Sequence, residues 1–178
     1  MKKGCLLFLF AMGAAVSNAQ NNTPEVHSPA ETFAARKGVI MEKRFDEVGK
    51  VGNLNVQIEY LSDLNTSDKL QCIRFDIQAN NTSHSALLDT NDVNELISFM
   101  KYLSTNVTNR PAVDPNTEIS FTTQYDFQIG CFWQGSNGWV LFLRTDSQAP
   151  STEADINQGD INSVLRIFRL AKAQIQRQ

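Results

Sequence analysis

Six stretches of the chain have the hydrophobic pattern of β-strands. In most of them apolar residues occupy every second position with polar residues between, which is typical of a strand with one buried face. The last is almost continuously apolar, as expected of a strand covered on both faces. The six stretches are residues 38–48, 53–60, 72–77, 118–123, 127–134 and 139–143.

Two further stretches have the spacing of amphipathic helices, with apolar residues three and four positions apart. The first begins at Asp89, with Asp92 three residues later, and fades near Asn106. The second begins at Asn157, with Asp160 three residues later. Such side chains cap free backbone N–H groups and complement the positive end of the helix dipole. We therefore interpret these residues as helix start signals rather than as paired catalytic carboxylates.

The two helix starts repeat each other at a distance of 68 residues, and each follows three predicted strands. This order suggests an internal duplication. The alternative is coincidence between two capped amphipathic helices, because any two such helices share the same apolar spacing. Ala86, Asp92 and Asn94 recur as Ala154, Asp160 and Asn162.

This arrangement predicts an α+β fold, because strands that precede a helix without strand–helix alternation indicate that class. We expect two strand-strand-strand-helix repeats that form one mainly antiparallel sheet of about six strands, with both helices packed on it. A single domain would span residues 36–178, with half-repeats at 36–106 and 114–178. Residues 20–35 are polar and predict a flexible leader before the domain.

The N-terminus has the organisation of a cleaved signal peptide. Lys2 and Lys3 precede a mostly apolar run at residues 5–16, and Ser17-Asn18-Ala19 places small residues where a signal peptidase reads. The apolar run is too short to span about 30 Å of hydrocarbon as a helix, so we do not expect a membrane span. We predict cleavage after Ala19 and export to a periplasmic or extracellular location.

The charge balance argues against nucleic acid as a partner. The chain has 16 basic and 19 acidic residues, a net charge of −3, and removal of Lys2 and Lys3 makes it −5. A negative protein is repelled by a phosphate backbone and by an anionic membrane surface.

Two cysteines remain after signal cleavage, and both fall in predicted strands. In an oxidising compartment Cys72 and Cys131 could form a disulfide, which would close a loop of about 60 residues and add on the order of 3–4 kcal/mol of stability. The alternative is two separate buried thiols, each acting as a small hydrophobic side chain.

The chain offers few candidates for catalysis. Its two histidines, His27 and His84, have no cysteine or carboxylate at metal-ligand spacing, so we predict no metal site. We also find no nucleophile elbow, phosphate-binding loop or dinucleotide fingerprint, and we predict no cofactor. A serine nucleophile assembled in space with His84 stays an alternative.

An aromatic hairpin is the main candidate for a binding feature. Phe132 and Trp133 are adjacent, so a strand directs them to opposite faces, and one of them would be exposed. An exposed tryptophan could stack on a sugar ring or anchor a protein partner. The alternative is that these aromatic residues belong to the core. The candidate ligand-binding residues are Tyr125, Phe132, Trp133 and Trp139.

A family resemblance follows from three features of the chain. A hydrophobic-Asp-x-x-acidic helix start begins at Leu88, Tyr102-Leu103 follows in the helix, and Thr122-Thr123 lies in a later strand. In these features the chain resembles a group of small exported bacterial proteins of unknown function. The tandem repeats also resemble the Whirly single-strand DNA-binding fold in topology, which implies nucleic-acid binding only by analogy.

These observations together favour an exported, non-enzymatic binding protein whose partner is a protein or a glycan. The alternatives are a secreted hydrolase with a site that no motif marks, and a single-stranded nucleic-acid binder by fold analogy.

Overall fold

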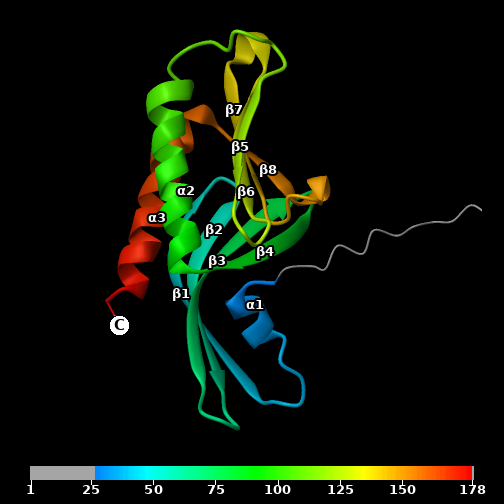
Figure 1. The fold of residues 1–178 in the computed structure, drawn as a ribbon, viewed down its shortest axis with the longest axis vertical. Helices are drawn as coiled ribbons and strands as arrows, with labels where there is room; N and C mark the ends of the chain where they lie inside the picture. The colour runs from blue at the N-terminus through cyan, green and yellow to red at the C-terminus, as the bar shows by residue number, and fades with distance from the viewer. Residues whose placement is uncertain (1–26, 178) are drawn as a thin grey trace, which may run out of the picture.

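The computed structural model describes residues 27–177 and shows a mixed α+β fold (Figure 1). Two antiparallel four-stranded sheets, β1-β2-β3-β4 and β5-β6-β7-β8, are each followed in the chain by a long helix. The predicted signal peptide and the first part of the predicted leader lie outside the described residues. The elements are α1 (Pro29–Ala34), β1 (Met41–Val51), β2 (Leu54–Asp63), β3 (Lys69–Ala79), β4 (Thr82–Leu88), α2 (Thr90–Tyr102), β5 (Glu118–Thr122), β6 (Gln128–Trp133), β7 (Trp139–Arg144), β8 (Glu153–Ile156) and α3 (Ile161–Ile175).

The prediction of one sheet of about six strands needs correction, because β4 and β8 were not expected. β4 begins after a tight turn in which Asn80 and Asn81 both have positive φ angles, 51° and 62°. Its side chains at Ser83 and Ser85 are exposed, so half of this edge strand reads as a polar loop. β8 has only four residues, which is too short for a period of two to be recognised. With these strands included, each half has four strands and a helix.

The repeat seen in the sequence is also present in the strand pairing. Ile73 of β3 lies opposite Leu88 of β4, and Leu141 of β7 lies opposite Ile156 of β8. Both members of the second pair follow their counterparts by 68 positions. The third and fourth strands of the two halves therefore share one register relative to the start of the helix.

The two long helices begin differently despite this shared register. The Asp89 side chain accepts hydrogen bonds from the backbone N–H groups of Asn91 and Asp92, and the Asp92 carboxylate accepts one from the N–H of Asp89. This is a complete capping box, which confirms the prediction for the first helix. At the second start the Asn157 side chain forms no cap hydrogen bond, and a 3₁₀ turn at Gln158–Asp160 precedes α3.

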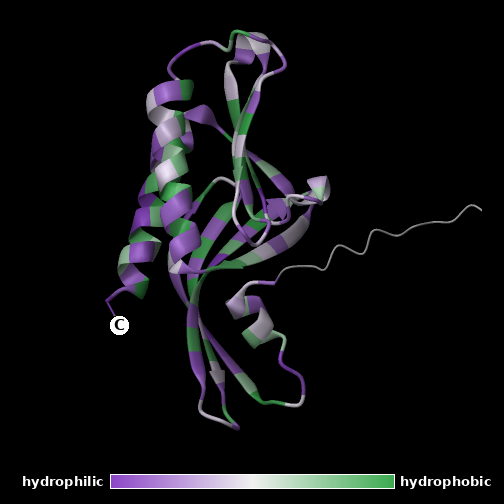
Figure 2. Cartoon of the chain, viewed as in Figure 1, coloured by the Kyte–Doolittle hydropathy of each residue, from purple (hydrophilic) through white to green (hydrophobic). Residues whose placement is uncertain are grey.

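The helix of the second half packs on the sheet of the first half. α3 contacts β1, β2 and β3, and it also lies beside α2 (Figure 1). Phe75 of β3 meets both Phe168 of α3 and Phe127, which precedes β6. Figure 2 shows hydrophobic and hydrophilic residues alternating around both helices, as expected when one face is buried. One continuous core therefore joins the two halves.

A short helix lies in the stretch assigned to the leader. Ser28 and Glu31 form a capping box at its start, and Pro29 occupies the first helical position, where its missing N–H costs nothing. Ala30 and Phe33 are buried with Leu61, Cys72 and Leu87 on the outer face of the first sheet. This burial docks α1 on the first sheet. Two apolar residues in a polar stretch were too weak a pattern to predict it.

The same outer face buries a carboxylate. The Glu59 side chain is fully buried, and its oxygens lie 3.2 Å from Nη1 of Arg74 and 3.4 Å from Nζ of Lys43. Arg74 also donates from Nε to Asp76, at 2.7 Å. A buried charge is tolerated when it is paired in this way.

No helix within residues 27–177 is both long enough and apolar enough to cross a membrane.

Candidate functional site

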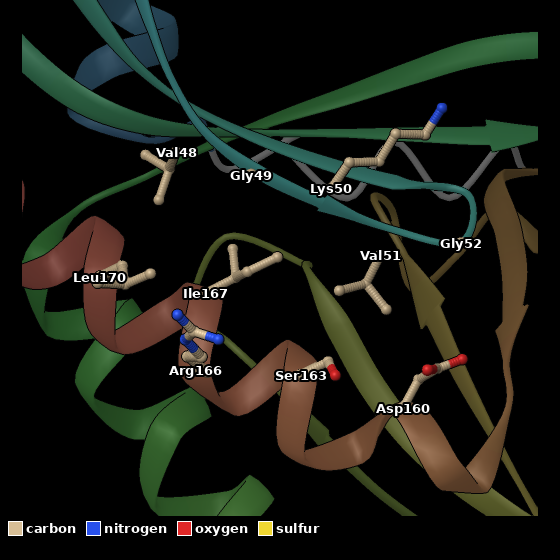
Figure 3. Close-up of a pocket in the computed structure, with 10 residues that line it drawn as sticks. All are labelled: Val48, Gly49, Lys50, Val51, Gly52, Asp160, Ser163, Arg166, Ile167 and Leu170. Atoms are coloured by element: carbon tan, nitrogen blue, oxygen red, sulfur yellow. The ribbon is translucent and has the colours of Figure 1, made fainter.

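The site with the clearest binding geometry is a cleft between the β1–β2 hairpin and α3, which we call the hairpin cleft (Figure 3). Its volume is about 530 Å³, which is in the range of small-molecule sites. Residues far apart in the sequence form its two walls. It is lined by Val48, Gly49, Lys50, Val51, Gly52, Asp160, Ser163, Arg166, Ile167 and Leu170.

Gly49 determines how closely the hairpin approaches the helix. A bulge interrupts the β1–β2 register between Glu47 and Gly49. A Cβ atom at Gly49 would lie 3.2 Å from Cδ1 of Ile167, which is closer than nearly all Cβ contacts. Glycine therefore lets the β1 backbone pass directly over α3, and this contact closes one side of the cleft.

Apolar side chains form part of the floor of the cleft. Figure 3 shows Val48, Ile167 and Leu170 facing one another between β1 and α3, with Val51 further along the hairpin. Ile167 is buried, whereas 45% of Leu170 is exposed. Because the exposed part of Leu170 borders the cleft, an apolar ligand seated there would remove it from water.

The polar side chains of the cleft come from α3. Ser163 and Arg166 lie one turn apart on the exposed side of the helix, and Asp160 lies just before it. Lys50 belongs to the lining, but Figure 3 shows its side chain extending away from α3. This orientation agrees with the register, since Lys50 pairs with Asn55 on the outer face of the sheet. Arg166 is thus the cation that α3 presents to the cleft.

The electrostatics of α3 favour an anion. From Ile161 to the end of the chain there is no aspartate or glutamate, while Arg166, Arg169 and Lys172 all lie on the helix. Within the described part of the chain, none of these three cations forms an ion pair. α3 is therefore a basic helix in a protein whose net charge is negative, and its Arg166 lies in a cleft that also holds Asp160.

The structure separates the four aromatic candidates. Trp139 is only 4% exposed, and its indole N–H donates to the carbonyl oxygen of Arg110 at 2.7 Å. Trp133 is half-buried and meets Trp139 edge-on, with ring centroids 5.5 Å apart. Phe132 lies on the opposite face of β6 beside Phe142, and Tyr125 is half-buried in the preceding turn. These residues do not converge on one exposed surface, and Trp139 has its polar group satisfied internally.

Cys72 and Cys131 are free thiols, and both are buried. Cys72 packs beneath α1 on the first sheet, whereas Cys131 belongs to the main core. Burial raises the pKa of each thiol to about 12, so neither has the thiolate character of a reactive cysteine.

The groups that a hydrolase would need beside His84 are not found there within residues 27–177. This residue lies on β4 opposite Ile77 and is half-buried. Across residues 27–177 it forms no hydrogen bond with a serine or a carboxylate, and no cluster of three potential metal ligands occurs there. A nucleophile needs a hydrogen-bonded base to be activated, so this geometry gives the hydrolase alternative no support.

Sequence reasoning missed the residues of the hairpin cleft. The available signal was the absence of acidic residues after Asp160 together with the three cations at Arg166, Arg169 and Lys172. That pattern marks α3 as a basic helix. It does not reveal that Val48 and Gly49 lie across from it.

Comparison with protein-family models finds no match to this chain, and comparison with curated proteins finds none either.

Proposed function

We propose that this chain is an exported, non-enzymatic binding protein whose hairpin cleft takes a small amphipathic anion. The observation that carries the proposal is the pairing of an apolar floor with an arginine that has no ion-pair partner among residues 27–177. The ligand class that fits is an apolar body with a carboxylate or phosphate head. This class differs from the protein or glycan partner expected from the aromatic hairpin.

Arg166 supports the head-group assignment. Its guanidinium presents several N–H donors in a plane, which matches the geometry of carboxylate and phosphate oxygens. Because it is exposed and has no ion-pair partner in the described part of the chain, a ligand can reach it without breaking an ion pair seen there. Asp160 lies at the other end of the cleft and repels an anion, so the head group is expected beside Arg166.

The floor supports the apolar part of the ligand. Val48, Val51 and Leu170 are partly exposed, and each would lose contact with water when a hydrocarbon chain covers it. Ser163 has a hydroxyl in the cleft but forms no hydrogen bond to a base within the described residues. Nothing there activates it as a nucleophile, which is why we propose binding rather than hydrolysis.

A fluorescent fatty acid, dansyl-undecanoic acid, tests this proposal by titration against the protein that begins at Gln20. We expect saturable binding that weakens at least fivefold in Arg166→Gln and strengthens in Asp160→Asn. Lys50→Gln is the matched control, because it removes one positive charge from a lining residue whose side chain points away. An uncharged dansyl amide with the same tail should bind much more weakly.

Equal affinity in Arg166→Gln and Lys50→Gln would overturn the assignment of the head group. Equal binding of the uncharged amide would show a general apolar surface instead of an anion site. A fluorescein-labelled oligothymidine, included in the same series, tests the nucleic-acid alternative, and we expect no binding.

Export is a separate part of the proposal and rests on the predicted signal peptide. N-terminal sequencing of the protein recovered outside the cytoplasm should begin at Gln20. Recovery of the intact chain, beginning at Met1, would contradict it.

A further inference from the structure

A second exposed feature lies at the edge of the core, where Phe99 of α2 meets Phe121 of β5. We call it the aromatic groove. Its volume is about 380 Å³, and it is lined by Asn94, Glu95, Ser98, Phe99 and Phe121. It shares no residue with the hairpin cleft and does not depend on the function proposed above.

The Phe99 and Phe121 rings of the lining form a row with the neighbouring ring of Tyr102, which lies outside the lining. The Phe99 ring lies 5.6 Å from that of Phe121 and 6.5 Å from that of Tyr102, measured between centroids. Tyr102 is 51% exposed, and the other two rings are partly exposed. Aromatic side chains held in a row in this way offer apolar area without a loss of side-chain freedom on binding.

The groove borders an unpaired sheet edge. β5 is the first strand of its sheet, so within residues 27–177 only β6 pairs with it. At the two ends of this strand pair, the N–H of Trp133 donates to the carbonyl oxygen of Thr117 and the N–H of Thr123 donates to that of Phe127. In an antiparallel pair, positions bonded to the partner strand alternate with positions whose backbone groups face outward. By that alternation the N–H and C=O groups of Glu118, Ser120 and Thr122 point away from β6.

The groove carries one acidic side chain. Glu95 is the charged residue of its lining, whereas the Glu118 side chain projects from the opposite face of β5 to that of Phe121. The Glu95 carboxylate has no ion-pair partner in the part of the chain that the structure describes. A basic side chain on an incoming partner would therefore find an unneutralised acid beside the aromatic rings.

We propose that β5 accepts an extended segment of a partner protein as a fifth strand of the second sheet. Alternate apolar side chains of that segment would lie on Phe99, Tyr102 and Phe121, and a lysine or arginine next to them would pair with Glu95. Main-chain hydrogen bonds to β5 supply affinity in this mode of recognition, and the groove supplies selectivity.

The test uses a fluorescein-labelled peptide of sequence Thr-Lys-Thr-Val-Thr-Val-Thr-Lys-Thr and the anisotropy of its label. Ser120→Pro removes the outward N–H of β5, and Ser120→Ala is the matched control. Both changes remove the hydroxyl that accepts from Gln128, at 3.3 Å, but only proline removes the donor. We expect Ser120→Pro to weaken binding at least tenfold relative to Ser120→Ala.

A second arm tests the groove itself. Glu95→Gln should weaken binding of the lysine peptide several-fold and leave binding of the same peptide with glutamine for lysine unchanged. Tyr102→Ser should weaken both peptides. Circular dichroism of each variant establishes that the fold is retained.

Equal affinity in Ser120→Pro and Ser120→Ala would overturn strand addition at β5. Sedimentation of the free protein gives the other decisive outcome. A dimer that Ser120→Pro dissociates would mean that a second copy of the chain occupies this edge, which also overturns the proposal. Arg166→Gln should not change peptide binding, so a failure here is distinguishable from a failure of the hairpin cleft.

Discussion

The ring of Phe75 in β3 meets the edge of the Phe168 ring in α3, with centroids 4.9 Å apart and ring planes at 70°. Both side chains are fully buried. α3 follows the second sheet in the chain, yet this contact seats it on the first. The pair therefore holds the two halves in one core, and the protein should unfold as one unit.

The change Phe168→Ala tests whether the two halves share one core and unfold together. Removing the ring leaves a cavity in the shared core, and we expect the free energy of unfolding to fall by about 3–5 kcal/mol. Urea unfolding should stay a single transition. Both tryptophans belong to the second half, so their fluorescence reports that half while circular dichroism reports both. Separate transitions by the two probes would contradict the shared core.

Phe45→Ala is the control, because this residue is 45% exposed, and the change should lower the free energy of unfolding by about 1 kcal/mol or less.

Gly130 in β6 provides a test of packing between strands. A Cβ atom there would lie 2.5 Å from Cζ of Phe142 and 2.8 Å from Cβ of Ser120. Because Phe142 is fully buried, its ring has little room to move, and Gly130→Ala should lower the free energy of unfolding by about 1–3 kcal/mol. Gly159→Ala is the matched control, since nothing lies within 4 Å of its added Cβ. Equal stability of the two variants in urea would refute this account of Gly130.

Asp92 should make stability depend on pH. Burial raises the pKa of its carboxyl group to about 6, although the hydrogen bond from the N–H of Asp89 acts in the opposite direction. In the unfolded chain the pKa of an aspartate is about 3.9. Between these values the folded protein keeps a proton that the unfolded chain has released. The stability that this proton supplies is complete below about pH 4 and is lost as the pH rises through about 6, with a total of roughly 2–3 kcal/mol.

The change Asp92→Asn isolates this effect, because the amide still accepts from Asp89 but does not titrate. We expect the variant to gain stability relative to the natural chain as the pH rises from 4 to 7. Urea unfolding at several pH values measures the difference between the two proteins. A difference that stays constant over this range would show that Asp92 does not titrate as described.

The two buried cysteines give a chemical test of the core. The protein that begins at Gln20 should show almost no reaction with a thiol reagent at pH 8, because burial shields both groups and raises the pKa of each to about 12. After unfolding without reductant, both Cys72 and Cys131 should titrate as thiols. Loss of both thiols under these conditions would indicate a disulfide. The assignment of Cys72 and Cys131 as separate buried thiols would then be wrong.

The sequence was most informative where structure depends on neighbours along the chain. The capping box of Asp89 and Asp92 was predicted correctly because both its hydrogen bonds join residues within one turn. The second helix start was less well predicted, since Asn157 bonds to the Asp160 side chain instead of capping the backbone. β4 was missed because its exposed serines carry no apolar period. Ser85 is held by Asp76 and Arg74 of the neighbouring strand, which no local pattern encodes.

The hairpin cleft shows where such reasoning ends. Gly49 and Ile167 both line it and lie in different halves of the chain, and a Cβ atom at Gly49 would lie 3.2 Å from Cδ1 of Ile167. From the sequence, Gly49 is a glycine in a strand and Ile167 is an apolar position of a helix. Neither pattern predicts that the two residues lie side by side.

By itself, the sequence determined six of the eight strands within residues 27–177, both long helices and the order of these elements, because side-chain period and helix capping act over a few residues. The tertiary structure decided that α3 covers the first sheet, that β5 is the edge strand of its sheet within residues 27–177, and that Arg166 lies in one cleft with Val48 and Leu170. These features depend on how side chains from distant segments fill a common core, as Phe75 and Phe168 do. The two candidate binding surfaces are the places where that packing leaves apolar side chains partly uncovered.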